Sequence, residues 1–255
     1  MTSAEPRVGE RMGVVTIVGG GPGDAGLVTV AGRDAIAAAD VILTDRLVPR
    51  AALAWARPGA EIIDVAKVPG GRSTGQDEIN RLLIEAAKAG NDVVRFKGGD
   101  SFVFGRGGEE VAACADAGIE TRVIPGVSSA LAVPALAGIP LTHRGLVQAF
   151  TVVSGHVPPG HPDSTVDWAA LARSGSTLVV MMGVRTLPAI TDALVAGGLD
   201  PDTPAAVIAD GTLPSQHVVR ADVATIAAAA QDAGVDPPAV TVIGDVAGLD
   251  LADDA

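Results

Sequence analysis

The stretch VVTIVGGGPGDAG (14–26) decides the fold class, because a β-branched run leads directly into a glycine-rich turn. A short apolar run bounded by glycines is typical of a buried strand in a parallel sheet. Similar strands are predicted outward along the chain at 40–45, 92–100 and 120–126. Segments of helical composition lie between and after them, at 29–40, 50–56, 76–90, 107–118 and 128–138. Strands that alternate with helices predict a parallel α/β sheet in the first half of the chain.

The pattern starts again after residue 145, so a second α/β unit is expected there. Strands are predicted at 148–156, 176–183, 205–212, 216–221 and 238–246, and helices around 186–198 and 222–234. We therefore expect two α/β domains, each a sheet flanked by helices. The predicted bounds are 13–145 for the N-terminal domain and 146–247 for the C-terminal domain, with flexible tails at 1–12 and 248–255.

Composition excludes several classes of function. The formal net charge is −12 and aromatic residues make up only 2% of the chain, which disfavours nucleic-acid binding. A single cysteine, Cys114, rules out a disulfide framework, and the histidines lack metal-ligand spacing, so no metal site is expected. Neither a membrane span nor an apolar signal segment is present in the sequence. The sequence therefore predicts a cytoplasmic protein with no membrane or nucleic-acid partner.

The glycine turn after the first strand raises a specific question. Gly21, Gly23 and Gly26 satisfy G-x-G-x-x-G, and Asp45 follows the next strand about where a dinucleotide fold keeps its ribose acid. An NAD-linked binding module is therefore one hypothesis. Against it, the helix is expected to begin only near Thr29, whereas a pyrophosphate sits on the first turn of a helix that starts at the glycines. In addition, Asp24 would face the phosphates and Pro22 lacks an N–H donor.

A second glycine-rich stretch, KGGDSFVFGRGGEE (97–110), is harder to explain as scaffolding. It packs five glycines, two phenylalanines and five ionisable residues into fourteen positions. Segments of this kind at strand ends are more often sites than connections, because glycine lets the backbone approach a ligand. Ligands of open α/β sheets bind outside the carboxyl ends of the strands. We therefore expect the site at this edge.

Several motifs together carry a resemblance to a known family. They are GGGPGD (19–24), DRLV (45–48), VVRFKGGDSFVFGRGGEE (93–110), PGVSSA (125–130), AGIPLTHR (137–144), TLVVMMG (177–183) and DGT (210–212). The combination resembles the uroporphyrinogen-III C-methyltransferases of the tetrapyrrole methylase family over about residues 13–246. The chain departs from the family pattern at Ser101, where proline is usual, and at Ser128 and Ser129, where Thr-Ala is common.

The resemblance implies a homodimer of two α/β domains with the active site in the cleft between them. It implies S-adenosyl-L-methionine as co-substrate and S-adenosyl-L-homocysteine as product. The expected reaction methylates uroporphyrinogen III twice, through precorrin-1 to precorrin-2, in cobalamin or siroheme biosynthesis. The chain resembles the stand-alone form, without a dehydrogenase–chelatase module. The alternative within the same fold and cofactor is a methyltransferase of another corrin precursor.

The resemblance also implies residue roles. Cofactor contacts fall on Pro22, Gly98, Gly99, Asp100, Val103, Ser128, Ser129, Met182 and Gly211. Catalytic roles fall on Asp45, Lys67 and Arg106, and contacts to the macrocycle fall on Arg106, Glu109 and Arg144.

The roles of Asp45 and Arg106 have structural alternatives that the sequence leaves open. Asp45 could be a turn carboxylate paired with Arg46. Arg106 could form a salt bridge to Glu109 or Glu110 near a helix start, and this pairing is compatible with a role in binding.

Overall fold

The computed structural model describes residues 11–66, 74–249 and 251. The chain forms two compact units that divide after Ser128. Each unit has its own sheet, as the sequence predicts, and each sheet has five strands. In the described part of the chain, no helix is long and apolar enough to cross a membrane.

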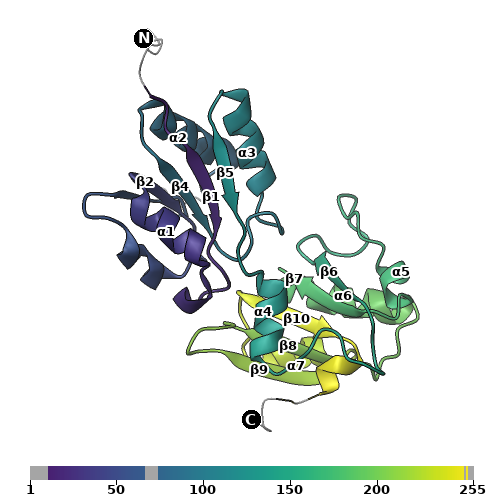
Figure 1. Ribbon diagram of the computed structural model, residues 1–255. Coiled ribbons are helices and arrows are strands. Elements are labelled where there is room, and N and C mark those ends of the chain that lie inside the picture. Colours follow the sequence, from purple (N-terminus) through teal and green to yellow (C-terminus); the bar gives the residue numbers. More distant parts are fainter. Residues whose placement is uncertain (1–10, 67–73, 250, 252–255) are drawn as a thin grey trace. The chain divides into compact units, whose positions relative to one another are not determined.

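The sheet of the first unit has the strand order β3-β2-β4-β1-β5, and all of its pairings are parallel (Figure 1). Its strands are β1 (Val15–Gly19), β2 (Val41–Thr44), β3 (Glu61–Asp64), β4 (Val93–Lys97) and β5 (Thr121–Ile124). Its helices are η1 (Ala25–Leu27), α1 (Val30–Ala38), η2 (Arg50–Trp55), α2 (Gln76–Lys88) and α3 (Gly107–Asp116). Because the strands run parallel, their carboxyl ends share one edge of the sheet, where the predicted site loops begin.

Both faces of this sheet are covered by helices. Alternation along the central strand β4 directs Val93 into a cluster with α2 and α3, and Val94 and Phe96 into a cluster with α1 and η2. Two charged residues, Arg95 and Lys97, share the face of Val93 and are also buried. The strand therefore changes from apolar to charged as it approaches the carboxyl edge.

The sheet of the second unit is mixed, with the strand order β6-β7-β10-β8-β9. Its strands are β6 (Phe150–Ser154), β7 (Thr177–Met181), β8 (Pro204–Ala209), β9 (His217–Asp222) and β10 (Ala239–Ile243). Its helices are α4 (Ser129–Leu136), α5 (Trp168–Ala172), η3 (Val184–Thr186), α6 (Leu187–Ala196), α7 (Ile226–Asp232) and η4 (Asp245–Gly248). β7 and β8 are both antiparallel to β10, so their carboxyl ends emerge at the same edge.

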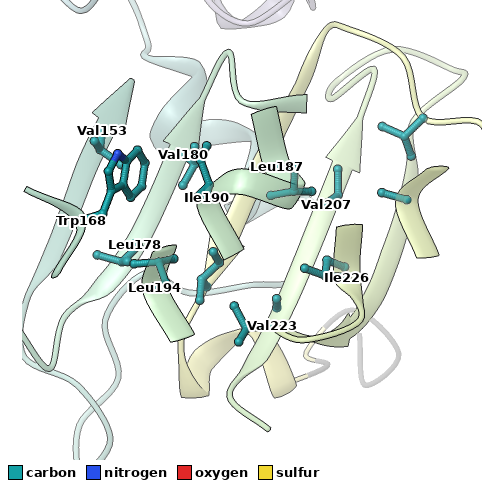
Figure 2. Close-up of a cluster of buried hydrophobic side chains, with 14 of the residues drawn as sticks. Val153, Trp168, Leu178, Val180, Leu187, Ile190, Leu194, Val207, Val223 and Ile226 are labelled. Carbon is teal, nitrogen blue, oxygen red and sulfur yellow. The ribbon is translucent and has the colours of Figure 1, made fainter. Parts of the chain in front are cut away.

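One face of the second sheet is buried under α5, α6 and α7. Figure 2 shows this cluster, in which Trp168 of α5, Ile190 of α6 and Ile226 of α7 surround the sheet residues Leu178 and Val207. The other face packs against α4. Burial of apolar side chains at about 25 cal/mol per Å² makes these two layers the main source of the unit's stability.

The division after Ser128 falls earlier than the boundary expected after residue 145. The difference is helix α4, which the sequence analysis assigned to the first domain. In the structure Ala130 and Val133 of α4 lie in one buried cluster with Val179 and Val242 of the second sheet. The apolar face of α4 therefore decides its membership, which its position before the AGIPLTHR motif does not reveal.

Strand β3 and helix α5 are not apparent from the sequence pattern, and one predicted α-helix has another form. β3 was missed because this short edge strand has the polar ends of EIID, and α5 because it has only five residues. The α-helix expected at 50–56 is the 3₁₀ helix η2, which follows Pro49 and has no side-chain cap.

Parts of both predicted tails belong to the described chain, and residues near them are held by contacts. Arg11 pairs with Asp92 at 2.7 Å. The guanidinium of Arg220 donates to the carbonyl oxygens of Ala247 at 2.6 Å and Leu249 at 3.0 Å. Residues 1–10 and 252–255 lie outside the described part of the chain.

Candidate active site

The loops that follow β1 and β4 are joined by backbone hydrogen bonds at the carboxyl edge of the first sheet. Gly21 and Gly99 exchange two of them, with N···O distances of 3.1 and 2.7 Å, and the amide of Gly20 donates to the carbonyl of Lys97 at 2.7 Å. The GPGD and KGGD motifs, far apart in the sequence, are therefore neighbours. Pro22 lies half-buried in the same loop.

Asp100 ties the β4 loop to the loop after β5. Its Oδ1 accepts a hydrogen bond from the amide of Phe102, and its Oδ2 accepts one from the amide of Gly126, both at 2.9 Å. The carboxylate is thus held in one orientation by two donors, and each oxygen retains a lone pair. A fixed, half-buried acceptor of this kind suits a polar ligand group, and the cofactor role of Asp100 stays a prediction.

Glycine is required where these loops meet. A Cβ on Gly98 would lie 2.8 Å from the carbonyl oxygen of Leu47, and one on Gly126 would lie 2.3 Å from the carbonyl oxygen of Gly99. Gly99 itself has φ 64°. The loops therefore pack backbone against backbone, which leaves main-chain groups at the edge. Val103, also in this segment, is exposed.

The structure answers the question raised by the GPGDAG loop. Asp24 caps the short helix η1 by accepting from the amide of Gly26 at 2.7 Å. Helix α1 begins only at Val30, and its N-cap Thr29 accepts from the amide of Gly32 at 3.0 Å. The late helix start predicted from the sequence is confirmed. The glycine turn is not the N-terminus of α1, so it lacks the arrangement in which a dinucleotide fold holds a pyrophosphate.

Asp45 directly follows β2 and does not pair with Arg46. Its Oδ1 accepts from Nη2 of Arg95 at 2.5 Å, and its Oδ2 lies 3.9 Å from Nζ of Lys97. The turn pairing considered from the sequence is therefore wrong, because strand register places Arg95 opposite Leu43, two residues before Asp45. One-third of the Asp45 side chain remains exposed.

Arg95 and Lys97 belong to a buried charge network that sequence reasoning missed. Oε1 of Glu110, in the first turn of α3, accepts from Nε of Arg95 at 2.9 Å and from Nζ of Lys97 at 3.0 Å. Gln76 of α2 donates to the same oxygen at 3.2 Å. A signal was present in VVRFK, where two charges stand at alternate positions of an otherwise apolar central strand.

Arg106 and Glu109 form an exposed pair at the start of α3. Nε and Nη2 of Arg106 contact the two carboxylate oxygens of Glu109 at 2.9 and 2.6 Å. The hydrogen bond from Arg106 lowers the pKa of Glu109, and the pair raises the pKa of Arg106. The pairing with Glu109 is the alternative noted from the sequence, and both side chains remain open to a ligand.

In the second unit, Met182 and Gly211 follow β7 and β8 at one edge of the sheet, on either side of β10. Met182 has φ 57° and is about half exposed. A Cβ on Gly211 would lie 2.5 Å from the Cγ atoms of Val133 in α4. Ser129 is the first residue of that helix. The structure thus gathers three predicted cofactor residues at the α4 side and edge of this sheet.

The remaining predicted residues have separate places. Ser128 is half-buried and ends the first unit. Arg144 is exposed in the loop 142–148, which forms a surface pocket of about 380 Å³. Within the described ranges, Arg144 forms no ion pair. Lys67 lies outside the described residues.

Backbone strain marks the same segments. The non-glycine residues with positive φ in the described chain are Phe104, Arg106, Met182, Asp210 and Thr212. All of them fall in the glycine-rich strand-end loops that the sequence singled out. Left-handed conformations cost roughly 1–3 kcal/mol each and concentrate at ligand sites. Their distribution supports functional loops in each unit.

Comparison with known proteins adds independent information. The profile of the family described as Tetrapyrrole (Corrin/Porphyrin) Methylases matches residues 14–227. The chain is 46% identical, over 237 residues, to the S-adenosyl-L-methionine-dependent uroporphyrinogen III methyltransferase of Methanosarcina barkeri, and the match covers 93% of each chain. It is also 46% identical to siroheme synthase 1 of Klebsiella pneumoniae, of which it spans 50%.

Among solved structures, the chain is likewise similar to a methyltransferase of this kind. The chain matches the crystal structure of uroporphyrin-III C-methyltransferase from Thermus thermophilus complexed with S-adenosylhomocysteine, with a TM-score of 0.78 and 40% identity. The match covers 92% of this chain and 98% of that one.

Proposed function

Because this chain belongs to the tetrapyrrole (corrin/porphyrin) methylase family, we propose that it is an S-adenosylmethionine-dependent methyltransferase of uroporphyrinogen III. It adds two methyl groups, through precorrin-1 to precorrin-2, and leaves S-adenosylhomocysteine. The observation that carries this proposal is the 46% identity that extends over 93% of both this chain and the Methanosarcina barkeri methyltransferase. The product would feed cobalamin or siroheme biosynthesis.

The loops have the character that S-adenosylmethionine requires. At the first sheet, Gly98 and Gly126 allow backbone groups to line the edge, since a side chain at either position would collide with a neighbouring carbonyl. Asp100 offers an acceptor fixed by two amides. At the second sheet, the exposed Met182 offers a polarisable contact for an aromatic ring. We assign the cofactor to these residues together with Pro22, Gly99, Val103, Ser128, Ser129 and Gly211.

When bound, the co-substrate supplies an electrophilic methyl group on sulfonium. The pyrrole carbons of the substrate are electron-rich, so alignment by the protein should provide most of the rate. After methylation the macrocycle is cationic and must lose a proton. We propose Asp45 as the acceptor, because it stands at the carboxyl edge of the first sheet and is one-third exposed. Lys67 remains a candidate proton donor from the family pattern.

Uroporphyrinogen III is rich in carboxylates, although this protein carries a net charge of −12. Local arginines resolve the conflict, since a guanidinium binds carboxylate with two parallel hydrogen bonds. We propose that Arg106 and Arg144 bind these groups. Glu109 would hold Arg106 in place until substrate arrives, because its two oxygens occupy the guanidinium in the meantime.

Two experiments separate this function from the alternatives. Titration calorimetry with S-adenosylhomocysteine and with NAD should show binding of the first only. Binding of NAD alone would favour a dinucleotide module. Incubation with S-adenosylmethionine and a panel of uroporphyrinogen III and later corrin precursors should give product from uroporphyrinogen III. Turnover of a later precursor alone would keep the fold and cofactor and reject the substrate.

We also propose a homodimer in the cytoplasm, as the family pattern implies. Light scattering coupled to size-exclusion chromatography should give twice the mass of one chain. A mass equal to one chain at micromolar concentration would contradict the dimer.

A further inference from the structure

We propose that Arg95 is a positioning residue, which Glu110 anchors and which fixes the Asp45 carboxylate at the carboxyl edge of the first sheet. The inference rests on the proposed function and on the proposed role of Asp45 as proton acceptor. It adds a residue pair that neither the sequence motifs nor the relatives assign.

The first support is that Arg95 is held rigidly. Its side chain is 2% exposed and projects from β4, the central strand of a parallel sheet. Nε contacts Oε1 of Glu110 at 2.9 Å, and Nη1 lies 3.4 Å from the carbonyl oxygens of Leu43 and Phe96. The guanidinium plane is therefore fixed by two strands and a helix before it reaches Asp45.

The second support is the graded exposure along the network. Glu110 is fully buried, Arg95 nearly so, and Asp45 is one-third exposed. Nη2 of Arg95 contacts only Oδ1 of Asp45, at 2.5 Å, while Oδ2 lies 3.9 Å from Lys97. One oxygen of Asp45 is thus engaged by the anchored arginine, and the other is not within hydrogen-bond distance of a described cation. This is the geometry expected of a carboxylate held for proton transfer.

The third support is that the network is costly as a stabilising device. Burying charges is expensive, and apolar replacements of buried ion pairs are often as stable or more stable. Oε2 of Glu110 is buried without a hydrogen-bond partner in the described structure. Burial, followed by the charge of Arg95, lowers the pKa of Lys97. If this side of β4 served stability alone, we would expect apolar residues such as Val93 to continue along it.

A double-mutant cycle tests the inference. The proteins are wild type, Asp45→Asn, Arg95→Lys and the double variant, with kcat and KM measured for uroporphyrinogen III. Loss of a general base lowers kcat by roughly 10²-fold or more. We expect Arg95→Lys to lower kcat by about tenfold, because lysine lacks the planar fork through which Nε of Arg95 contacts Glu110 while Nη2 contacts Asp45. In the double variant kcat should match Asp45→Asn, and the affinity for S-adenosylhomocysteine should stay within about twofold of wild type.

The matched control is Arg50→Lys. Arg50 pairs with Asp64 at 2.9 Å in the same unit, and that carboxylate is exposed to a similar degree, 28%. The kcat of Arg50→Lys should equal that of wild type. If Arg95→Lys does not fold, Glu110→Gln serves instead, since it keeps the shape of Glu110 and releases Arg95 from its anchor.

The outcomes are distinguishable. A wild-type protein that does not methylate uroporphyrinogen III would overturn the proposed function and this inference with it. An active wild type with losses that multiply in the double variant would overturn the positioning role alone. A wild-type kcat in Arg95→Lys would do the same.

Discussion

Arg106 stands at the start of α3 in a left-handed conformation, with φ 58° and its guanidinium paired to Glu109. We predict that Arg106→Ala loses turnover of uroporphyrinogen III and keeps its affinity for S-adenosylhomocysteine, because the residue is assigned to substrate carboxylates. Steady-state kinetics measures the turnover, and calorimetry on the same preparation measures the affinity for S-adenosylhomocysteine. Arg122→Ala is the control, since Arg122 forms a similarly exposed pair with Glu120. A drop in cofactor affinity in Arg106→Ala would move Arg106 to the cofactor site.

Gly126 tests the close packing of the site loops. An added Cβ would lie 2.3 Å from the carbonyl of Gly99, and this backbone cannot move aside cheaply. We predict that Gly126→Ala destabilises the protein by about 1–3 kcal/mol and weakens S-adenosylhomocysteine binding. Urea unfolding and calorimetry provide the values. Gly108→Ala is the control, because nothing lies within 4 Å of its added Cβ, and it should not destabilise the helix. Equal stability of both variants would contradict the packing argument.

Cys114 is the chain's single thiol, and it is fully buried. Burial raises its pKa to about 11 from the usual 9.0. Folding therefore favours the neutral thiol, and this contribution to stability is complete below pH 9 and is lost as pH rises through about 11. We predict that a thiol reagent at pH 8 reacts with the denatured protein and only negligibly with the native one. Fast reaction of the native protein would show that the thiol is accessible.

At the scale of elements, α1 owes its late start to a capping residue. Oγ1 of Thr29 accepts from the amide of Gly32 at 3.0 Å, which satisfies one of the free donors of the first turn. We predict that Thr29→Ala lowers the free energy of unfolding by about 1 kcal/mol, while Thr29→Ser retains most of this capping contribution. Denaturant titration checks this. An unchanged free energy of unfolding in Thr29→Ala would mean that packing alone fixes the helix start.

Elements were predictable where periodicity is strong. The strands 15–19 and 93–97 and the helix 76–88 stand close to their predicted places, because their apolar pattern and their glycine or charge signals agree. β3 and α5 have no such pattern, since one is a polar edge strand and the other has five residues. Membership of α4 was also hidden, because a helix that is apolar on most sides does not show which sheet it covers.

The candidate site shows the same division. Loop residues such as Asp100, Arg106 and Met182 were named from motifs, which are local in the sequence. The partner of Asp45 was not, because Arg95 reaches it through the β2–β4 register, across 50 residues of chain. Without knowledge of that register, the neighbouring Arg46 was the obvious ion-pair partner for Asp45. Networks formed between strands and helices depend on topology that a motif does not contain.

At the scale of the whole molecule, the chain has two α/β units with strained, glycine-rich loops at strand ends in each. The proposed cofactor residues lie in loops of each unit, and the proposed ligands of the substrate carboxylates are local arginines. This arrangement lets a protein with a net charge of −12 accept an acidic macrocycle. The central claim is therefore methylation of uroporphyrinogen III by this chain.

The most direct measurement counts the methyl groups transferred. The protein is incubated anaerobically with uroporphyrinogen III and S-adenosylmethionine that carries an isotopically labelled methyl group, and the macrocycle is analysed by mass spectrometry. The account predicts a product with two labelled methyl groups and two equivalents of S-adenosylhomocysteine. A macrocycle that carries no label, from protein that binds S-adenosylhomocysteine, would contradict the account.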